Sequence, residues 1–178
     1  MTQPDSSGST VEQAWAKAKA YCFDLLATRA RSTDELRQAL HRKGYDAALG
    51  ERLLQNLDES GLVDDTEFAE NWTRARHNSQ GLGKKAIRAE LKRKGIADET
   101  AEEAVAEIAA SDEEQRAREL VRKRLPAMSG LGERTVIRRL LGMLGRKGYS
   151  QGLAYRVIRE ELTDAERDAS LLEDETPD

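Results

Sequence analysis

The sequence contains little of what several protein classes require. It has one cysteine, Cys22, so no disulfide can form within the chain, which fits a reducing, cytoplasmic environment. Three prolines and 4% aromatic residues argue against a loop-rich fold and against a β-sandwich or barrel. No run of about 18 apolar residues occurs, and the first ten residues are polar, so we expect neither a membrane span nor a secretory signal.

Charged residues, in contrast, make up 35% of the chain and are distributed unevenly. Residues 81–95 contain six basic residues against one acidic residue, whereas residues 160–178 contain nine acidic residues against one basic residue. The formal net charge of -4 hides these opposite patches, which say more about binding partners than the net charge does. The high charged fraction is typical of narrow helices with wide solvated faces.

The sequence repeats itself three times around a lysine–glycine pair. The pairs end at Gly44, Gly95 and Gly148, which are 51 and 53 positions apart. Matched apolar residues lie four and eight positions before each glycine, and nine and ten positions after it: Leu40, Leu91 and Leu144; Leu36, Ile87 and Leu140; Leu53, Ala104 and Val157; Leu54, Val105 and Ile158. A period near fifty residues predicts a tandem array of one supersecondary unit.

Each repeat is predicted to consist of three α-helices. Apolar positions four residues apart form one stripe of a helix. The lysine before each glycine lies in the last helical turn, where a cation is favourable, and the glycine suits the left-handed residue that ends a helix. We therefore predict an all-α fold with nine helices, at residues 12–29, 33–43, 47–59, 65–78, 83–94, 98–110, 112–125, 132–147 and 151–163.

The predicted domain organisation is an elongated array of three three-helix repeats. A module of about fifty residues is marginally stable alone, so neighbouring repeats should dock on one another. We place the repeats at residues 12–62, 63–110 and 111–163, with a disordered N-terminal segment at 1–11 and an acidic disordered tail at 164–178. The tail composition is typical of disorder.

Several helix starts are recognisable from capping residues. Ser32 and Ser111 each precede a glutamate by three residues, which matches the capping box. Asp46 and Ser150 follow the first and third glycines by two residues and are predicted to cap the next helix. The second repeat has alanine at that position, so we expect Asp98 to cap its helix one residue later.

The sequence carries no recognisable catalytic, metal or cofactor site. His41 and His77 lie in different repeats, and a single cysteine leaves no zinc-binding spacing. Residues 81–83 read Gly-Leu-Gly but lack the preceding strand and the further glycine of a nucleotide-binding loop. Cys22 shares an apolar helix face and is interpreted as a buried small hydrophobe.

Two short patterns have both a functional and a structural interpretation. Asp64 and Asp65 could form an acid–base pair or a magnesium-binding pair, but a helix N-cap with an acidic first turn is the interpretation that we favour. Phe68 and Trp72 are four residues apart, and we expect them in a core rather than on a base-stacking platform.

Basic helices form the most informative predicted surface. In repeats two and three, lysines and arginines fall on a different helix face from the apolar residues. The candidate residues for binding a partner protein or DNA are Lys84, Lys85, Arg88, Lys92, Arg93, Arg138, Arg139, Arg146 and Lys147. Such clusters suit phosphates or an acidic protein surface. A merely solvated face is the other interpretation, and the residues alone leave both open.

The chain resembles the RecX family of bacterial regulatory proteins. The resemblance is carried by the lysine–glycine pairs with their upstream leucines and by residues 61–69, which read Gly-Leu-Val-Asp-Asp-Thr-Glu-Phe-Ala. It extends from about Ala14 to Leu162. Tyr149 stands where the family commonly has phenylalanine, and the N-terminal dozen residues and the acidic tail lie outside the resemblance.

The resemblance implies a fold and a function. The fold is three tandem three-helix repeats, in agreement with the periodicity. The function is that of a non-enzymatic modulator, usually an inhibitor, of the RecA recombinase. Family members bind in the groove of the RecA–single-stranded-DNA filament and depress its growth, ATPase, strand exchange and coprotease activity. The family supplies no catalytic residues and no cofactor, and we expect a monomer.

The alternative function is direct DNA binding without RecA. Three-helix units resemble helix-turn-helix modules, in which one helix enters the major groove. The corresponding helix of the second repeat, at residues 98–110, has five acidic residues and no basic residue, so duplex phosphates should repel it. A hydrolase or nuclease lacks any carboxylate–histidine constellation and is set aside.

Overall fold

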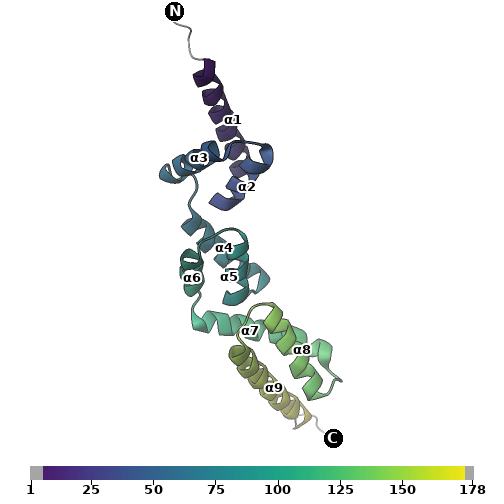
Figure 1. Ribbon diagram of the computed structural model, residues 1–178. Coiled ribbons are helices and arrows are strands. Elements are labelled where there is room, and N and C mark those ends of the chain that lie inside the picture. Colours follow the sequence, from purple (N-terminus) through teal and green to yellow (C-terminus); the bar gives the residue numbers. More distant parts are fainter. Residues whose placement is uncertain (1–5, 175–178) are drawn as a thin grey trace, which may run out of the picture. The chain divides into compact units, whose positions relative to one another are not determined.

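The computed structural model describes the backbone of residues 6–174 and the side-chain surroundings of residues 10–166. Within this span all regular secondary structure is helical, as predicted (Figure 1). The helices are α1 (Ser6–Thr28), α2 (Thr33–Lys43), α3 (Ala47–Glu59), α4 (Asp65–Gln80), α5 (Lys84–Arg93), α6 (Asp98–Ala106), α7 (Ala110–Arg124), the short 3-10 helix η1 (Leu125–Met128), α8 (Glu133–Arg146) and α9 (Gln151–Asp174).

The terminal helices are longer than predicted. Helix α1 begins at Ser6, and α9 continues to Asp174. Residues 6–11 and 164–174 are therefore helical where we expected disorder, whereas residues 1–5 and 175–178 lie outside the described residues. Elongation of a formed helix gains one hydrogen bond per residue, and the acidic segment also contains alanine, leucine and arginine, which are strong helix formers.

The described helices pack into two compact units. Unit 1 contains the described residues up to Asn71 together with Leu91–Ala101. Unit 2 contains Trp72–Glu90 together with the described residues from Glu102 onward. Residues of the predicted middle repeat thus contribute to both units.

The core of unit 1 lies between α1, α2 and α3. Its buried residues are Ala18, Cys22, Leu36, Leu40, Leu53, Leu54, Leu57 and Val63. The Cys22 side chain is completely buried, and burial raises the pKa of its thiol. Cys22 is therefore a packing residue, as we expected. Phe68 is also buried, in agreement with its predicted place in a core.

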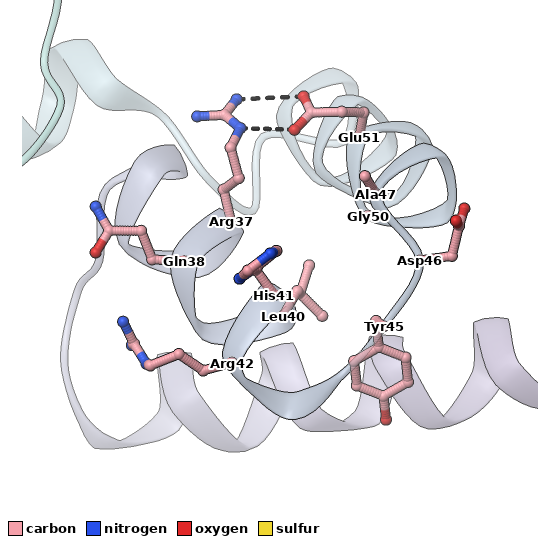
Figure 2. A pocket seen from close by; sticks show the side chains of 10 residues that line it. All are labelled: Arg37, Gln38, Leu40, His41, Arg42, Tyr45, Asp46, Ala47, Gly50 and Glu51. Carbon is pink, nitrogen blue, oxygen red and sulfur yellow. Dashed lines mark hydrogen bonds and ion pairs between the residues drawn. The ribbon is translucent and has the colours of Figure 1, made fainter.

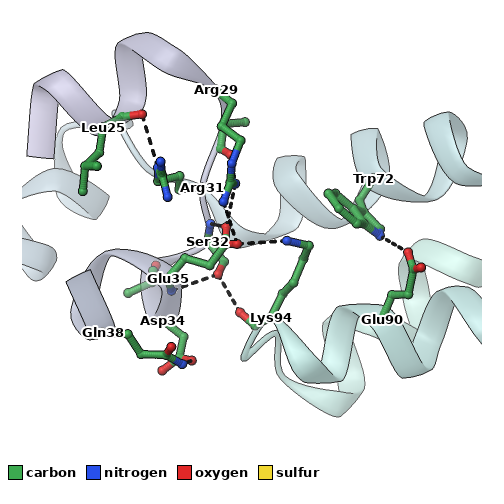
Figure 3. A network of polar contacts seen from close by, with 12 residues as sticks. Leu25, Arg29, Arg31, Ser32, Asp34, Glu35, Gln38, Trp72, Glu90 and Lys94 are labelled. Atoms are coloured by element: carbon green, nitrogen blue, oxygen red, sulfur yellow. Dashed lines mark hydrogen bonds and ion pairs between the residues drawn. The ribbon is translucent and has the colours of Figure 1, made fainter. Parts of the chain in front are cut away.

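The core of unit 2 is formed mainly by α7, α8 and α9, and α9 packs against both other helices. Its buried residues are Ala117, Val121, Val136, Leu140, Leu144, Tyr149, Ala154, Val157 and Ile158. Trp72 of unit 2 is only half-buried, and its indole N–H donates to Glu90 over 2.8 Å (Figure 3). The polar tip explains why this aromatic residue is not fully enclosed.

Side-chain caps explain where three helices begin. Ser32 forms the complete capping box with Glu35 at the start of α2, as predicted. Asp46 accepts from the N–H of Leu49 and Ser150 accepts from the N–H of Leu153, again as predicted.

The Asp64 carboxylate caps α4 by accepting from the N–H groups of Thr66 and Glu67. Its neighbour Asp65 accepts from the N–H of Thr33 at 2.8 Å. The N-cap interpretation of the aspartate pair is thus confirmed, and both carboxylates are occupied by backbone donors.

Two predicted caps are wrong. Helix α7 begins at Ala110 after Ala109, which offers no side-chain acceptor, so Ser111 lies inside the first turn and its hydroxyl contacts Asp112. Asp98 is the first residue of α6 rather than its cap, because the helix already starts with the carbonyl of Ala97 accepting from the N–H of Ala101.

In unit 1, the lysine–glycine turn after α5 docks on the first turn of α2. The Ser32 hydroxyl donates to the Lys94 carbonyl over 2.6 Å, and the Lys94 ammonium pairs with Glu35 at 2.9 Å (Figure 3). Gly95 has a φ of 75°, and a Cβ there would lie 2.2 Å from Cβ of Asp34. We call this contact the unit 1 clasp, and only glycine fits at its centre.

Glu35 is the electrostatic centre of the unit 1 clasp. Burial raises the pKa of this carboxyl, but hydrogen bonds from Arg29, Lys94 and the Ser32 N–H outweigh burial and lower the pKa to about 2. The carboxylate therefore stays ionised well below its ordinary range.

In unit 2, the lysine–glycine turn after α8 docks on the segment before α5. The Gly83 N–H donates to the Lys147 carbonyl over 2.8 Å, and the Lys147 ammonium donates to the Gln80 carbonyl over 2.6 Å. The Tyr149 hydroxyl donates to the Gly81 carbonyl over 3.1 Å. We call this contact the unit 2 clasp.

Two glycines allow the backbones of the unit 2 clasp to approach closely. Gly148 has a φ of 86°, and a Cβ there would lie 2.3 Å from the backbone nitrogen of Ala86. A Cβ on Gly83 would lie 2.8 Å from the Gly148 carbonyl oxygen. The repeated lysine–glycine pair therefore ends a helix and also joins consecutive repeats.

Candidate functional site

Helix α8 presents the clearest basic surface of unit 2. Arg138, Arg139 and Arg146 are exposed to solvent. The opposite side of the helix faces the core through Val136, Leu140 and Leu144. The division between a buried apolar face and an exposed basic face is the one that the sequence predicts.

The arginines of α8 have no ion-pair partner among residues 10–166, whose side chains the structure describes, unlike Arg118 and Arg122 of the neighbouring α7. On α7, Arg118 binds Glu114 at 2.6 Å and also contacts Glu160 and Glu161. Arg122 binds Glu161 at 2.6 Å. The hydrogen bonds that Arg118 donates to Glu114, Glu160 and Glu161 raise its pKa above its ordinary value. Arg118 and Arg122 are thus used inside the fold, and the α8 arginines are available to a partner.

Sequence reasoning missed one member of this surface. Arg134 is exposed one helical turn before Arg138, and its spacing of four residues was the available signal. Gly142 lies between the arginines, and a Cβ there would lie 3.3 Å from Arg146 Nη1. We define the α8 arginine face as Arg134, Arg138, Arg139 and Arg146.

The basic residues of α5 that belong to unit 2 line a groove of mixed charge. The groove, with a volume of about 370 Å³, lies beside Lys84, Lys85 and Arg88. Arg88 pairs with Glu102 at 2.5 Å, and Glu113 accepts from the backbone N–H of Lys84 at 3.1 Å. These carboxylates offset part of the positive charge, so this surface is less strongly cationic than its sequence suggests.

Two further predicted residues, Lys92 and Arg93, belong to unit 1. Both side chains are exposed, and Lys92 lies 3.4 Å from Asp98. An ion pair this exposed contributes about 0–1 kcal/mol, so it does not hold the lysine in place.

Lys147 differs from the other predicted site residues. It is half-buried, its ammonium is bound to the Gln80 carbonyl, and its own carbonyl accepts from Gly83. The structure therefore gives Lys147 a role inside the unit 2 clasp, and the proposed interface is built without it.

A repeated ion pair borders an apolar pocket in unit 1. The pocket, of about 370 Å³, lies between α2 and α3, and Figure 2 shows Arg37 bridging to Glu51 at its edge. The same pair recurs 51 positions later as Arg88 and Glu102. In the third repeat Leu141 and Tyr155 take these positions, and Tyr155 is 48% exposed.

The histidines do not form a metal or catalytic group. His41 is exposed, whereas His77 is buried with Nδ1 2.9 Å from the Leu82 carbonyl oxygen. Among the described residues, no group of three or more histidine, cysteine, aspartate or glutamate side chains could hold a metal ion. None of the described helices is both long and apolar enough to cross a membrane.

Three family models match consecutive parts of the chain. They describe the first three-helix domain of RecX at residues 18–57, the second at residues 64–105 and the third at residues 112–158. The chain is also 56% identical over 163 residues to the Regulatory protein RecX of Amycolatopsis mediterranei, covering 92% of this chain and 93% of that protein. The Regulatory protein RecX of Thermobifida fusca is 42% identical over 159 residues, covering 89% and 86%.

Solved structures share the fold. The crystal structure of RecX from Lactobacillus salivarius matches with a TM-score of 0.79 at 22% identity, covering 84% of this chain and 97% of that one. A second crystal structure of a regulatory protein RecX matches with a TM-score of 0.80 at 23% identity, covering 89% and 79%. At such identities the likeness concerns the fold alone. Together with the three matched domains and the close relatives, it agrees with the resemblance seen in the sequence, and the chain belongs to the RecX family of regulatory proteins.

Proposed function

We propose that this protein regulates the RecA recombinase by binding in the groove of the RecA–single-stranded-DNA filament. Binding there limits filament growth and depresses the ATPase, strand-exchange and coprotease activities of RecA. The protein would act in the cytoplasm during DNA repair, recombination and the SOS response. Membership of a family of regulatory proteins supports this proposal.

The α8 arginine face is the observation that carries the proposal. Like charges four residues apart on a helix cost about 0.2–0.5 kcal/mol, and the described residues provide no carboxylate that offsets the cost. Arginine forms two parallel hydrogen bonds with carboxylates and phosphates, which are the groups that an acidic protein surface and a DNA backbone offer. A RecA–DNA filament contains both.

A chain with several modules suits a filament better than a single ligand. The α8 arginine face would make one set of contacts, and the half-buried Lys84 with the exposed Lys85, Lys92 and Arg93 would make others. Linked weak contacts gain from effective concentration, because the second contact forms within an existing complex. Preferential binding to one state of the filament is then sufficient to shift its assembly.

The test is charge reversal on α8. The triple variant Arg138→Glu, Arg139→Glu, Arg146→Glu should raise the concentration needed for half-inhibition of RecA's DNA-dependent ATPase by at least about tenfold, which corresponds to about 1.4 kcal/mol. The core residues of α8 are untouched, so the variant should retain the helical circular dichroism of the parent.

Two control variants make the result specific. The variant with lysine at the same three positions keeps the charge and should retain most of the inhibition. Lys17→Glu with Lys19→Glu reverses charge on α1 of unit 1, a helix that contributes no residue to the proposed face, and should inhibit like the parent. A folded triple glutamate variant that inhibits RecA normally would remove the α8 arginine face from the proposal.

Direct DNA binding without RecA is the alternative function. Helix α8 is compatible with it, because arginines also bind the phosphates of duplex DNA. Helix α6 opposes it, since its exposed Glu99, Glu102 and Glu103 would face the DNA in a helix-turn-helix arrangement. A gel-shift titration at several salt concentrations separates the two functions. Tight, sequence-specific binding to duplex DNA in the absence of RecA would favour the alternative.

A further inference from the structure

The unit 2 clasp joins two short sequence elements. One is the Lys-Gly-Tyr turn at residues 147–149, and the other is the Gly-Leu-Gly segment at residues 81–83. The segment lies directly before α5. Its Gly81 carbonyl accepts a hydrogen bond from the Tyr149 hydroxyl, and its Gly83 N–H donates to the Lys147 carbonyl. Because the last glycine has no Cβ, the two backbones can touch.

The chain contains a second copy of each element. Residues 43–45 again read Lys-Gly-Tyr, and residues 130–132 again read Gly-Leu-Gly. The glycines of the two turns have nearly the same conformation, with a φ of 87° at Gly44 and 86° at Gly148. The segment at 130–132 lies directly before α8, and its first glycine has a positive φ like Gly81.

Neither the turn at residues 43–45 nor the segment at residues 130–132 is docked on another element within the described part of the chain. The Lys43 carbonyl, the Tyr45 hydroxyl and the Gly132 N–H have no hydrogen-bond partner among the described residues. A Cβ on Gly44 or on Gly132 would meet no described atom within 4 Å. In addition, Leu131 is 37% exposed. The counterparts of the backbone and hydroxyl groups that the unit 2 clasp uses are therefore present and available, whereas the Lys43 ammonium lies 5.5 Å from the centre of the Tyr21 ring.

We propose that the Lys-Gly-Tyr turn at residues 43–45 of one copy of this protein docks on the Gly-Leu-Gly segment at residues 130–132 of a second copy. The Gly132 N–H would donate to the Lys43 carbonyl, and the Tyr45 hydroxyl would donate to the Gly130 carbonyl. The exposed Glu133, which follows the segment in the second copy, would lie near Arg42 and Lys43 at the turn of the first copy, so opposite charges would meet. A second copy of this protein is the expected partner, because the same two sequence elements already bind each other in unit 2.

This association joins different surfaces of the two copies. After pairing, one copy would keep a free segment and the other a free turn, so the contact is head-to-tail and does not close on itself. The unit 2 clasp forms within one chain and gains from an effective concentration in the millimolar range, whereas two separate copies must first lose translational and rotational freedom. We therefore expect monomers in dilute solution and association at high local concentration, such as on a shared filament.

The experiment compares full-length variants by sedimentation velocity from tens of micromolar to about 1 mM, the range set by the effective concentration. The parent protein should show a weight-average mass that rises with concentration. Gly132→Ala should abolish the rise, because the added Cβ meets no described atom of its own chain within 4 Å but would lie against the Gly44 carbonyl of the second copy. Tyr45→Phe should weaken association by removing one hydroxyl.

The matched control is Gly145→Ala, since a Cβ at this α8 glycine also meets no described atom within 4 Å. It should associate like the parent. In an equimolar mixture of Tyr45→Phe and Gly132→Ala, the only fully intact pairing is the turn of the Gly132→Ala variant on the segment of the Tyr45→Phe variant, so the mixture should form mainly dimers. A parent protein that stays monomeric at 1 mM, or association that Gly132→Ala and Gly145→Ala change equally, would overturn the proposal.

Discussion

Gly44 and Gly148 allow a direct test of how much the unit 2 clasp contributes to stability. A Cβ on Gly44 would meet no described atom within 4 Å, whereas a Cβ on Gly148 would collide with Ala86. Gly44 and Gly148 have φ values of 87° and 86°, so replacing either by alanine places a side chain in the same unfavourable backbone conformation. That strain costs about 1–2 kcal/mol at each position. At Gly44 the new Cβ meets no described atom within 4 Å, so strain should be the whole effect.

At Gly148 the same substitution also forces the unit 2 clasp open. The new Cβ would lie 2.3 Å from the Ala86 nitrogen, so the turn must move away from α5. The bonds from Gly83 to Lys147 and from Tyr149 to Gly81 would then break. At about 0.5–1.5 kcal/mol for each bond, Gly148→Ala should cost about 1–3 kcal/mol more than Gly44→Ala.

The assay is urea unfolding of both variants and the parent, followed by circular dichroism. The difference between the two variants is the informative quantity, because the backbone strain and the lost chain entropy are common to both. Equal free energies of unfolding for the two variants would refute the reasoning. It would mean that the close approach at Gly148 contributes nothing to stability.

Two further predictions concern the clasps. Glu35 has a pKa lowered to about 2, so its contribution to stability is present above the ordinary carboxyl pKa and is lost as the pH falls toward 2; Glu35→Gln should flatten the dependence of the unfolding free energy on pH below about 4.5, and an unchanged acid limb would contradict this. Tyr149→Phe removes the hydroxyl that donates to Gly81 and should cost about 0.5–1.5 kcal/mol in urea unfolding, whereas Tyr155→Phe, at an exposed ring, should cost less.

Most of the fold could be predicted from the sequence because its signals are local and repeated. The apolar stripes around Leu40 and Leu144 and the glycines after them define helices and their ends without tertiary information. The interior helices accordingly begin and end within four residues of their predicted bounds. The capping of α7 was mispredicted because Ser111 and Ala109 both lie near the helix start, and the sequence does not show which position has the N-cap backbone conformation.

The candidate site was only partly predictable. Helical spacing separates basic from apolar faces, so the exposure of Arg138 and Arg139 followed from the sequence. The partners of charged residues did not follow, because they depend on packing between helices. Lys147 is bound to the Gln80 carbonyl, 67 positions away, and Arg118 is bound to Glu160 and Glu161 on another helix. The paired and unpaired arginines of unit 2 could therefore be distinguished only in three dimensions.

Regulation of RecA is the central claim, and the ATP hydrolysis of preformed RecA filaments on single-stranded DNA tests it most directly. The full-length protein is added at substoichiometric ratios to RecA, and hydrolysis is followed over time. We expect a progressive decline in the hydrolysis rate, which the triple glutamate variant of α8 should fail to produce. Hydrolysis that continues unchanged after addition of the folded parent protein would contradict the account.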